Sequence, residues 1–270
     1  MLLEPGLIGL GWPKAYGDGW APAPGIRYEA RELARLLEES LLQVALQPVL
    51  TLQPGGVLGY EALIRGPKTS TLHAPDRLFH VAQQVGWLPE LEMAARAAII
   101  ARFARLGLDG FLFLNTIPSV LPEPDLGRAG LLELLARYDL PPERVVVEVS
   151  EAVPDLRRPA VTEALRGIQT AGMRLAVDDL GAGSTAVWPR AGLSPDFAKL
   201  DPGLVRDLAQ DDLSRQLVFS LCEIARALDA RVVGKGVETR AELEELATLD
   251  EKRGKLAQER GRQIIAAARE

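Results

Sequence analysis

Short apolar and β-branched runs alternate along most of this chain with segments of helix length. The apolar runs lie at residues 44–52, 57–64, 111–116, 144–151, 174–181, 197–201 and 231–238. The longer segments carry apolar residues three and four apart and end at a glycine or a polar turn, as at residues 29–44, 89–107, 159–172 and 214–229. Strands that alternate with helices predict right-handed βαβ units and a parallel sheet.

The first two apolar runs are joined differently from the rest. They are joined by only TLQPGGV, residues 51–57, which includes the last two residues of the first run and the first residue of the second. This connection is too short for a helical crossover, so we expect the first two strands to be antiparallel. The 270 residues suit one α/β barrel, which typically has about 250 residues.

Composition excludes several classes of protein. Apolar residues make up 47% of the chain and charged residues 25%, which favours a globular fold over disorder. The formal net charge of −6 argues against a nucleic acid polymer as partner. The sequence has no apolar run of 18 residues and no signal-peptide pattern, so we expect no membrane segment and a cytoplasmic location. The single cysteine, Cys222, agrees with a reducing compartment.

Polar residues stand at or near the C-terminal ends of the expected strands. They are Glu61, Asn115, Glu148, Asp178, Asp179, Lys199, Lys235 and Glu238. In a barrel such strand ends converge on one face, where active sites lie. Each residue also has a structural interpretation: a strand-end carboxylate can cap a turn, and Lys199 could pair with Asp201 or Glu238.

The oxygen-bearing members of this set suit a hard divalent cation. Glu61, Asn115, Glu148 and Asp178 offer carboxylate and amide oxygens, which Mg²⁺ and Mn²⁺ prefer, and the lack of His and Cys argues against structural zinc. Neighbouring strand residues face opposite ways, but at the end of the strand Asp178 and Asp179 could both address one site. Two metals about 3.5 to 4 Å apart would serve phosphodiester hydrolysis.

An ordered set of motifs resembles the EAL domain family. The motifs are YEALIR at residues 60–65, LFLNTIPSVL at 112–121, VEVSE at 147–151, DDLGAGST at 178–185, FAKLD at 197–201 and GVET at 236–239. The resemblance covers about residues 36–248. It implies an α/β fold, a modified TIM (β/α)8-like barrel with an antiparallel first strand, and hydrolysis of cyclic di-GMP to linear pGpG.

The resemblance also implies roles for individual residues. The family's Mg²⁺ or Mn²⁺ ligands fall on Glu61, Asn115, Glu148, Asp178 and Asp179. Lys199 matches the lysine that helps to hold or activate the attacking water, and Glu151 matches the glutamate that positions the loop after DDLG. Gln47 and Arg65 match contacts to the dinucleotide, and Glu238 matches a carboxylate behind the metal ligands. Family members often pair through barrel helices, which leaves a homodimer open.

At Lys235 the chain departs from the family pattern. The family usually reads AEGVET where this chain reads GKGVET, and the glutamate that Lys235 replaces is a ligand of the second metal. Unit charges about 4 Å apart repel by about 4 kcal/mol at an effective dielectric constant of about 20, and a divalent ion feels about twice that. The first metal site therefore fits the sequence, whereas the second is disfavoured unless Lys235 swings out to solvent.

The chain also departs from the family at its end. We divide it into a Gly- and Pro-rich extension at residues 1–28, a barrel domain at 29–248 and a charged helix at 249–270. The family's eighth strand, with its Gln-Gly-Tyr motif, has no counterpart after residue 248, so this strand is missing or displaced. GLIGLGWP at residues 6–13 could fill the gap, or these residues could be an ordinary extension.

Three functions remain open at the level of sequence. The first is a metal-dependent cyclic di-GMP phosphodiesterase, which the intact first metal set favours. The second is a degenerate EAL domain that binds cyclic di-GMP or a protein partner without hydrolysis, which Lys235 favours. The third is a purely structural interaction module, with the charged terminal helix as its pairing surface.

Overall fold

The computed structural model describes residues 24–52, 55–150, 156, 158–181, 193–208 and 210–249. Residues 6–13 and nearly all of the expected terminal helix at 249–270 lie outside this part of the chain. The displaced-strand hypothesis therefore concerns residues beyond those described. Within the described residues no helix is long and apolar enough to cross a membrane.

Seven strands make one mixed sheet in the order β1-β2-β3-β4-β5-β6-β7. The strands are β1 Gln43–Thr51, β2 Gly56–Arg65, β3 Phe111–Asn115, β4 Val145–Ser150, β5 Arg174–Leu180, β6 Phe197–Leu200 and β7 Arg231–Gly234. The α-helices are α1 Arg27–Glu38, α2 Pro75–Val85, α3 Leu88–Leu106, α4 Arg128–Arg137, α5 Pro159–Thr170, α7 Pro202–Asp207 and α8 Asp212–Ala227. The predicted alternation of strands and helices is confirmed. The described residues contain no eighth strand, and residues 240–249 are helical.

The chain divides into two compact units. Unit 1 comprises Met1–Val147 and Pro159–Arg174, and unit 2 comprises Glu148–Arg158 and Leu175–Glu270. Strand β4 contributes its first half to unit 1 and its second half, from Glu148 on, to unit 2.

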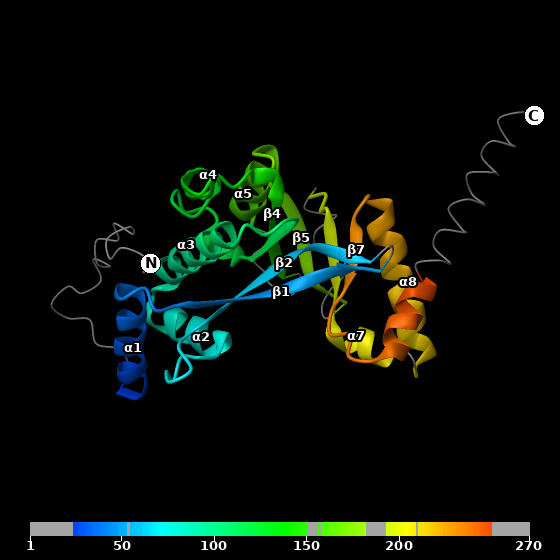
Figure 1. The fold of residues 1–270 in the computed structure, drawn as a ribbon, viewed down its shortest axis with the longest axis horizontal. Helices are drawn as coiled ribbons and strands as arrows, with labels where there is room; N and C mark the ends of the chain where they lie inside the picture. Colours follow the sequence, from blue (N-terminus) through cyan, green and yellow to red (C-terminus); the bar gives the residue numbers. More distant parts are fainter. Residues whose placement is uncertain are drawn as a thin grey trace, which may run out of the picture. The chain divides into compact units, whose positions relative to one another are not determined.

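The antiparallel first pair is the distinctive part of unit 1. Strands β1 and β2 form a long ribbon in which Gln47 lies opposite Glu61, and β2 then pairs in parallel with β3 (Figure 1). A Cβ atom on Gly59 would lie 2.3 Å from the Phe111 carbonyl oxygen, so the close approach of β2 and β3 requires glycine there. The predicted antiparallel pairing is confirmed.

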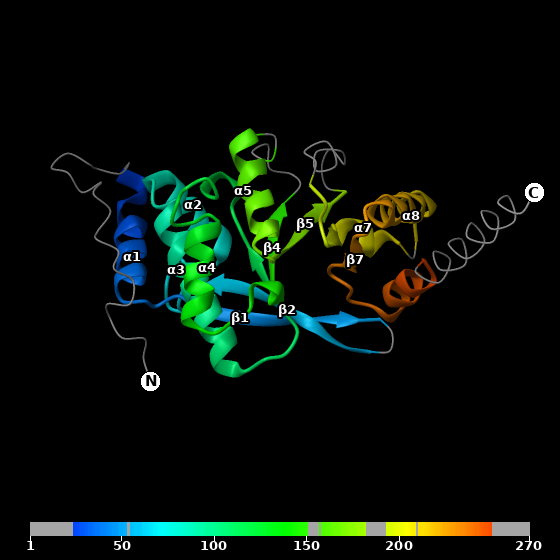
Figure 2. The same ribbon diagram turned by 90° about the horizontal axis from the view of Figure 1, so that it is seen from above.

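The helices of unit 1 follow from their apolar spacing. In α2 the buried residues Leu78, Val81, Ala82 and Val85 recur three or four apart, and the helix stops at Gly86, whose φ of 76° is left-handed. Helix α1 contacts α2 and α3 (Figure 1), and α4 contacts both α3 and α5, a group that Figure 2 shows from above. Apolar faces of these helices thus supply much of the core of unit 1.

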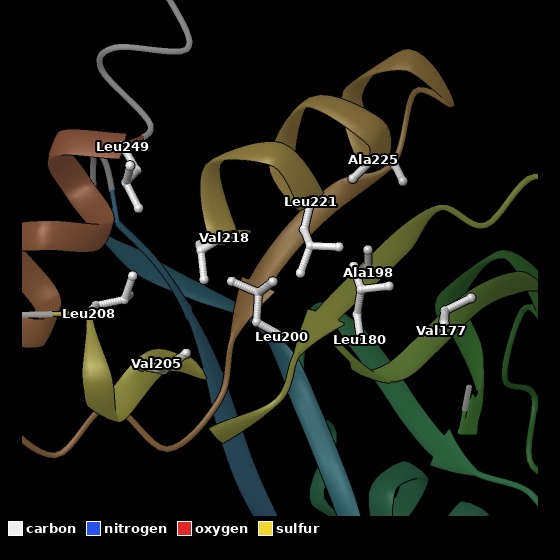
Figure 3. Packing of buried hydrophobic residues seen from close by; sticks show 11 residues of the cluster. Val177, Leu180, Ala198, Leu200, Val205, Leu208, Val218, Leu221, Ala225 and Leu249 are labelled. Carbon is white, nitrogen blue, oxygen red and sulfur yellow. The ribbon is translucent and has the colours of Figure 1, made fainter. Parts of the chain in front are cut away.

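Unit 2 has its own hydrophobic core. Strands β5, β6 and β7 are parallel neighbours. The buried residues Val218, Leu221 and Ala225 of α8 belong to one hydrophobic cluster, which also contains Leu180 of β5 and Ala198 and Leu200 of β6 (Figure 3). Helix α8 begins at Asp212 because the Asp211 carboxylate accepts hydrogen bonds from the Leu213 and Ser214 backbone N–H groups. This core supports the strand ends that carry Asp178, Asp179 and Lys199.

Candidate functional site

In unit 1 the structure brings together two of the predicted metal ligands. Asn115, at the end of β3, donates from Nδ2 to Oε1 of Glu61 on β2, over 3.3 Å. Gln47 lies opposite Glu61 on β1, and Arg65, the last residue of β2, donates from Nη1 to the Ile64 carbonyl oxygen over 2.8 Å. Asn115 and Gln47 are both exposed, so their amides are accessible to a ligand.

A buried ion pair holds the segment that follows Asn115. Oε1 of Glu92 accepts from Arg96 Nη2 at 2.9 Å and from the Ile117 backbone N–H at 3.3 Å. Arg96 also donates from Nη1 to the Leu126 carbonyl oxygen. Burial raises the pKa of the Glu92 carboxyl, whereas the charge and hydrogen bonds of Arg96 act in the opposite direction. The pair thus anchors both ends of the segment between Ile117 and Leu126, although sequence reasoning did not identify it.

In unit 2 the first cluster is a buried pair of opposite charges. Lys199 Nζ on β6 lies 2.7 Å from Glu148 Oε1 on β4, and both side chains are almost fully buried. The sequence allows Asp201 or Glu238 as a partner of Lys199, but the structure shows this lysine paired with Glu148. Asp201 caps α7 by accepting from the Gly203 backbone N–H.

The second cluster of unit 2 centres on Lys235. Its ammonium nitrogen lies 2.8 Å from Asp178 Oδ1, 2.9 Å from Asp178 Oδ2 and 2.8 Å from Asp179 Oδ1. The idea that Lys235 swings out to solvent is therefore wrong for this structure. Burial lowers the pKa of Lys235, but the hydrogen bonds and charges of the two aspartates outweigh it and hold the pKa above its ordinary value.

An irregularity in β5 turns both aspartates toward the lysine. The register between β5 and β6 shifts between Val177 and Leu180, so Asp178 and Asp179 together stand opposite one residue, Lys199. Asp179 has a left-handed φ of 56°. A bulge with such a residue re-aims a side chain that would otherwise face the other side of the sheet. The sequence predicts this convergence from the end of the strand, yet β5 continues to Leu180 and the bulge accounts for it.

Glu238 and Thr239 lead into the next helical segment. The Glu238 and Thr239 backbone N–H groups donate to Glu242 Oε2 at 2.7 and 2.9 Å, and the Glu242 backbone N–H donates to Thr239 Oγ1 at 3.2 Å. This reciprocal arrangement is a capping box, which the pattern T-x-x-E at residues 239–242 could have indicated. The hydrogen bonds from Glu238 and Thr239 lower the pKa of Glu242.

The lysines decide how well unit 2 fits a divalent metal. The carboxylates of Glu148, Asp178 and Asp179 all contact an ammonium group. Within the described residues no three His, Cys, Asp or Glu side chains lie together so that they could hold an ion. As arranged here, the pair Asp178 and Asp179 does not fit a second metal. Glu151 lies outside the described residues.

The chain is similar to proteins of known family. The family model described as "EAL domain" matches residues 30–252. The chain is 28% identical over 224 residues to the Pseudomonas aeruginosa "Bifunctional diguanylate cyclase/cyclic di-GMP phosphodiesterase MucR", a match that covers 81% of this chain and 32% of MucR. This chain thus spans about a third of that relative.

Two solved structures extend the comparison. A calcium and cyclic di-GMP complex of Klebsiella pneumoniae BlrP1 is 30% identical with a TM-score of 0.70, covering 77% of this chain and 52% of that one. The Xanthomonas citri FimX EAL domain with cyclic di-GMP is 20% identical with a TM-score of 0.73, covering 82% of this chain and 88% of that one. At 20% identity, the similarity to the FimX EAL domain shows a shared fold and nothing more.

Proposed function

Since the chain belongs to the EAL domain family, we propose that it binds cyclic di-GMP and that it acts as a receptor for this dinucleotide rather than as an efficient phosphodiesterase. The dinucleotide is carried over from relatives such as BlrP1, whose structure contains it. The observation that favours a receptor is the contact of Lys235 Nζ with both Asp178 and Asp179. Two-metal hydrolysis needs such carboxylates for cations, and here an ammonium group holds them.

Recognition of the dinucleotide rests on groups in unit 1. Arg65 is held at the end of β2 by its bond to the Ile64 carbonyl, and the rest of its planar fork is suited to a phosphate. Gln47 provides an exposed amide on the neighbouring strand. Both positions match dinucleotide contacts in the family, and we assign them the same role here.

Replacing Arg65 with Met should weaken binding of cyclic di-GMP about tenfold or more, because a charge-assisted hydrogen bond contributes about 1.5 to 3 kcal/mol. The measurement is isothermal titration calorimetry of purified protein with cyclic di-GMP. Arg137→Met is the matched control, since Arg137 lies on the exposed side of α4 and pairs only with Glu133 among the contacts that the structure describes. Unchanged affinity in Arg65→Met would rule out this contact, and no binding by the natural sequence would rule out the function.

Hydrolysis to pGpG is the second candidate function. The specific observation in its favour is that Glu61 and Asn115 remain in contact at 3.3 Å, and that Lys199 is present beside Glu148. These residues match the family's first metal set and its water-holding lysine. If these residues suffice for hydrolysis without a second metal, the natural sequence will release pGpG at a substantial rate in Mn²⁺.

Replacing Lys235 with Glu should raise the rate of pGpG release in Mn²⁺ at least about tenfold, because it removes the cation that competes for Asp178 and Asp179. Chromatography of the products over time gives the rate. Adding Glu61→Ala to the same variant should abolish the gain, which ties it to the metal ligands rather than to a contaminant. If the natural sequence already releases pGpG as fast as the variant, the hydrolase assignment replaces the receptor.

A further inference from the structure

Lys235 has the contacts that a bound metal ion would have. An ammonium group has three N–H donors, and Lys235 Nζ has three carboxylate oxygens within 2.9 Å, from two different aspartates. The side chain is 23% exposed, so the contact lies partly out of water, where charge interactions are stronger than at the surface. One of the two negative charges of Asp178 and Asp179 is thus already balanced by a cation that belongs to the chain.

The geometry around this contact is built into the backbone. The left-handed Asp179 turns both carboxylates to one side, and the Asp179 backbone N–H donates to Asp178 Oδ1 at 2.9 Å. Ser150 Oγ lies 3.3 Å from Asp179 Oδ2. On the other side, β7 ends at Gly234 and Gly236 takes a left-handed φ of 67°, which sets the turn that carries Lys235. The backbone therefore places the two aspartates and the lysine where their side chains can meet.

Charge arithmetic links this lysine to a divalent ion. Replacing Lys235 with Glu changes the local charge by two units, from +1 to −1, and one bound divalent cation restores it. A lysine here therefore provides the same net charge as a glutamate with its metal. A divalent ion cannot share the two aspartates with the ammonium group without strong repulsion, so the two cations exclude each other.

We propose that the Lys235 ammonium replaces a divalent cation at Asp178 and Asp179, so that cyclic di-GMP binds to this chain without a metal at that position. The inference rests on the proposed function, because it concerns binding of the same dinucleotide. Lys235 offsets one of the two aspartate charges close to the strand ends of unit 2, which lowers their repulsion of an anionic phosphodiester. Divalent cations are then not required for binding.

The test compares cyclic di-GMP affinity in EDTA and in Mn²⁺ for the natural sequence and for Lys235→Glu. The natural sequence should bind with the same affinity, within about twofold, in both buffers. Lys235→Glu should bind at least tenfold more tightly in Mn²⁺ than in EDTA. Electron paramagnetic resonance of Mn²⁺ alone, without dinucleotide, should show at least tenfold tighter Mn²⁺ binding by Lys235→Glu than by the natural sequence.

Two further variants keep the test decisive. Arg240→Glu makes the same two-unit change of charge on an exposed residue of unit 2 that pairs with Glu244, and it should not gain Mn²⁺ affinity. Lys235→Met removes the ammonium without adding a ligand, and it should weaken binding of cyclic di-GMP in EDTA; it takes the place of Lys235→Glu if that variant does not fold.

Each contrary result has a separate meaning. If the natural sequence binds cyclic di-GMP only in Mn²⁺, the inference that Lys235 replaces the metal is overturned while the receptor function stands. The same holds if the natural sequence binds Mn²⁺ as tightly as Lys235→Glu does. Undiminished binding by Lys235→Met in EDTA also overturns the inference. If the natural sequence binds no cyclic di-GMP in either buffer, the proposed function itself fails.

Discussion

Replacing Arg96 with Met is expected to lower the free energy of unfolding by about 3 to 5 kcal/mol, the usual cost of removing one partner of a buried ion pair. The side chains of Arg96 and Glu92 are only 3% and 2% exposed. Without the guanidinium, the Glu92 carboxylate stays buried, and the Leu126 carbonyl loses its donor. Urea denaturation followed by far-UV circular dichroism measures the change.

The chain contains a matched control for this experiment. Arg137 and Glu133 form the same pair, four residues apart on a helix, but their side chains are 48% and 68% exposed. Arg137→Met should therefore cost less than about 1 kcal/mol. Equal losses in the two variants would show that burial does not set the importance of the Arg96 pair. Cyclic di-GMP binding by Arg96→Met adds a second readout, because the pair anchors the segment after Asn115.

Lys199→Met is expected to have an effect of similar size in unit 2. Its partner Glu148 is buried, and the variant leaves that carboxylate without the ammonium group 2.7 Å away. We expect a loss of about 3 to 5 kcal/mol in the free energy of unfolding, again measured in urea. A loss below about 1 kcal/mol would mean that the pair does not stabilise unit 2.

A double variant separates the charge from the packing. Replacing Glu148 and Lys199 together with Met removes both charges at once, and buried pairs exchanged for apolar residues are often neutral. The double variant should therefore be more stable than Lys199→Met alone. A double variant that loses as much as Lys199→Met and Glu148→Met added together would indicate that the two side chains act independently.

The strands and their first pairing could be predicted because they depend on local patterns. Alternation of apolar runs with helical segments located all seven strands, and the short TLQPGGV connection predicted the antiparallel pair. The last strand was predicted too long, at residues 231–238, because Gly236 takes a left-handed conformation and β7 stops at Gly234. Helix α8 begins two residues earlier than predicted because of the Asp211 cap.

The contacts of the candidate site could not be predicted in the same way. Lys235 meets Asp178 across 57 residues, and Lys199 meets Glu148 across 51, so no sequence spacing reveals either pair. The Lys235 contact depends on the bulge in β5, which follows no obvious sequence signal. By contrast, the spacing of Glu92 and Arg96 in an apolar helix was visible in the sequence and could have indicated a buried pair.

Because Lys235 is part of the chain, the cation at Asp178 and Asp179 does not have to be taken up from solution. A group tethered by a short stretch of chain faces its partner at an effective concentration set by geometry, commonly about millimolar or higher. The cation at Asp178 and Asp179 therefore cannot be diluted, chelated or exhausted. If Lys235 takes the place of the metal as proposed, binding of the dinucleotide would follow the dinucleotide concentration alone and would not change with the concentration of free manganese or magnesium.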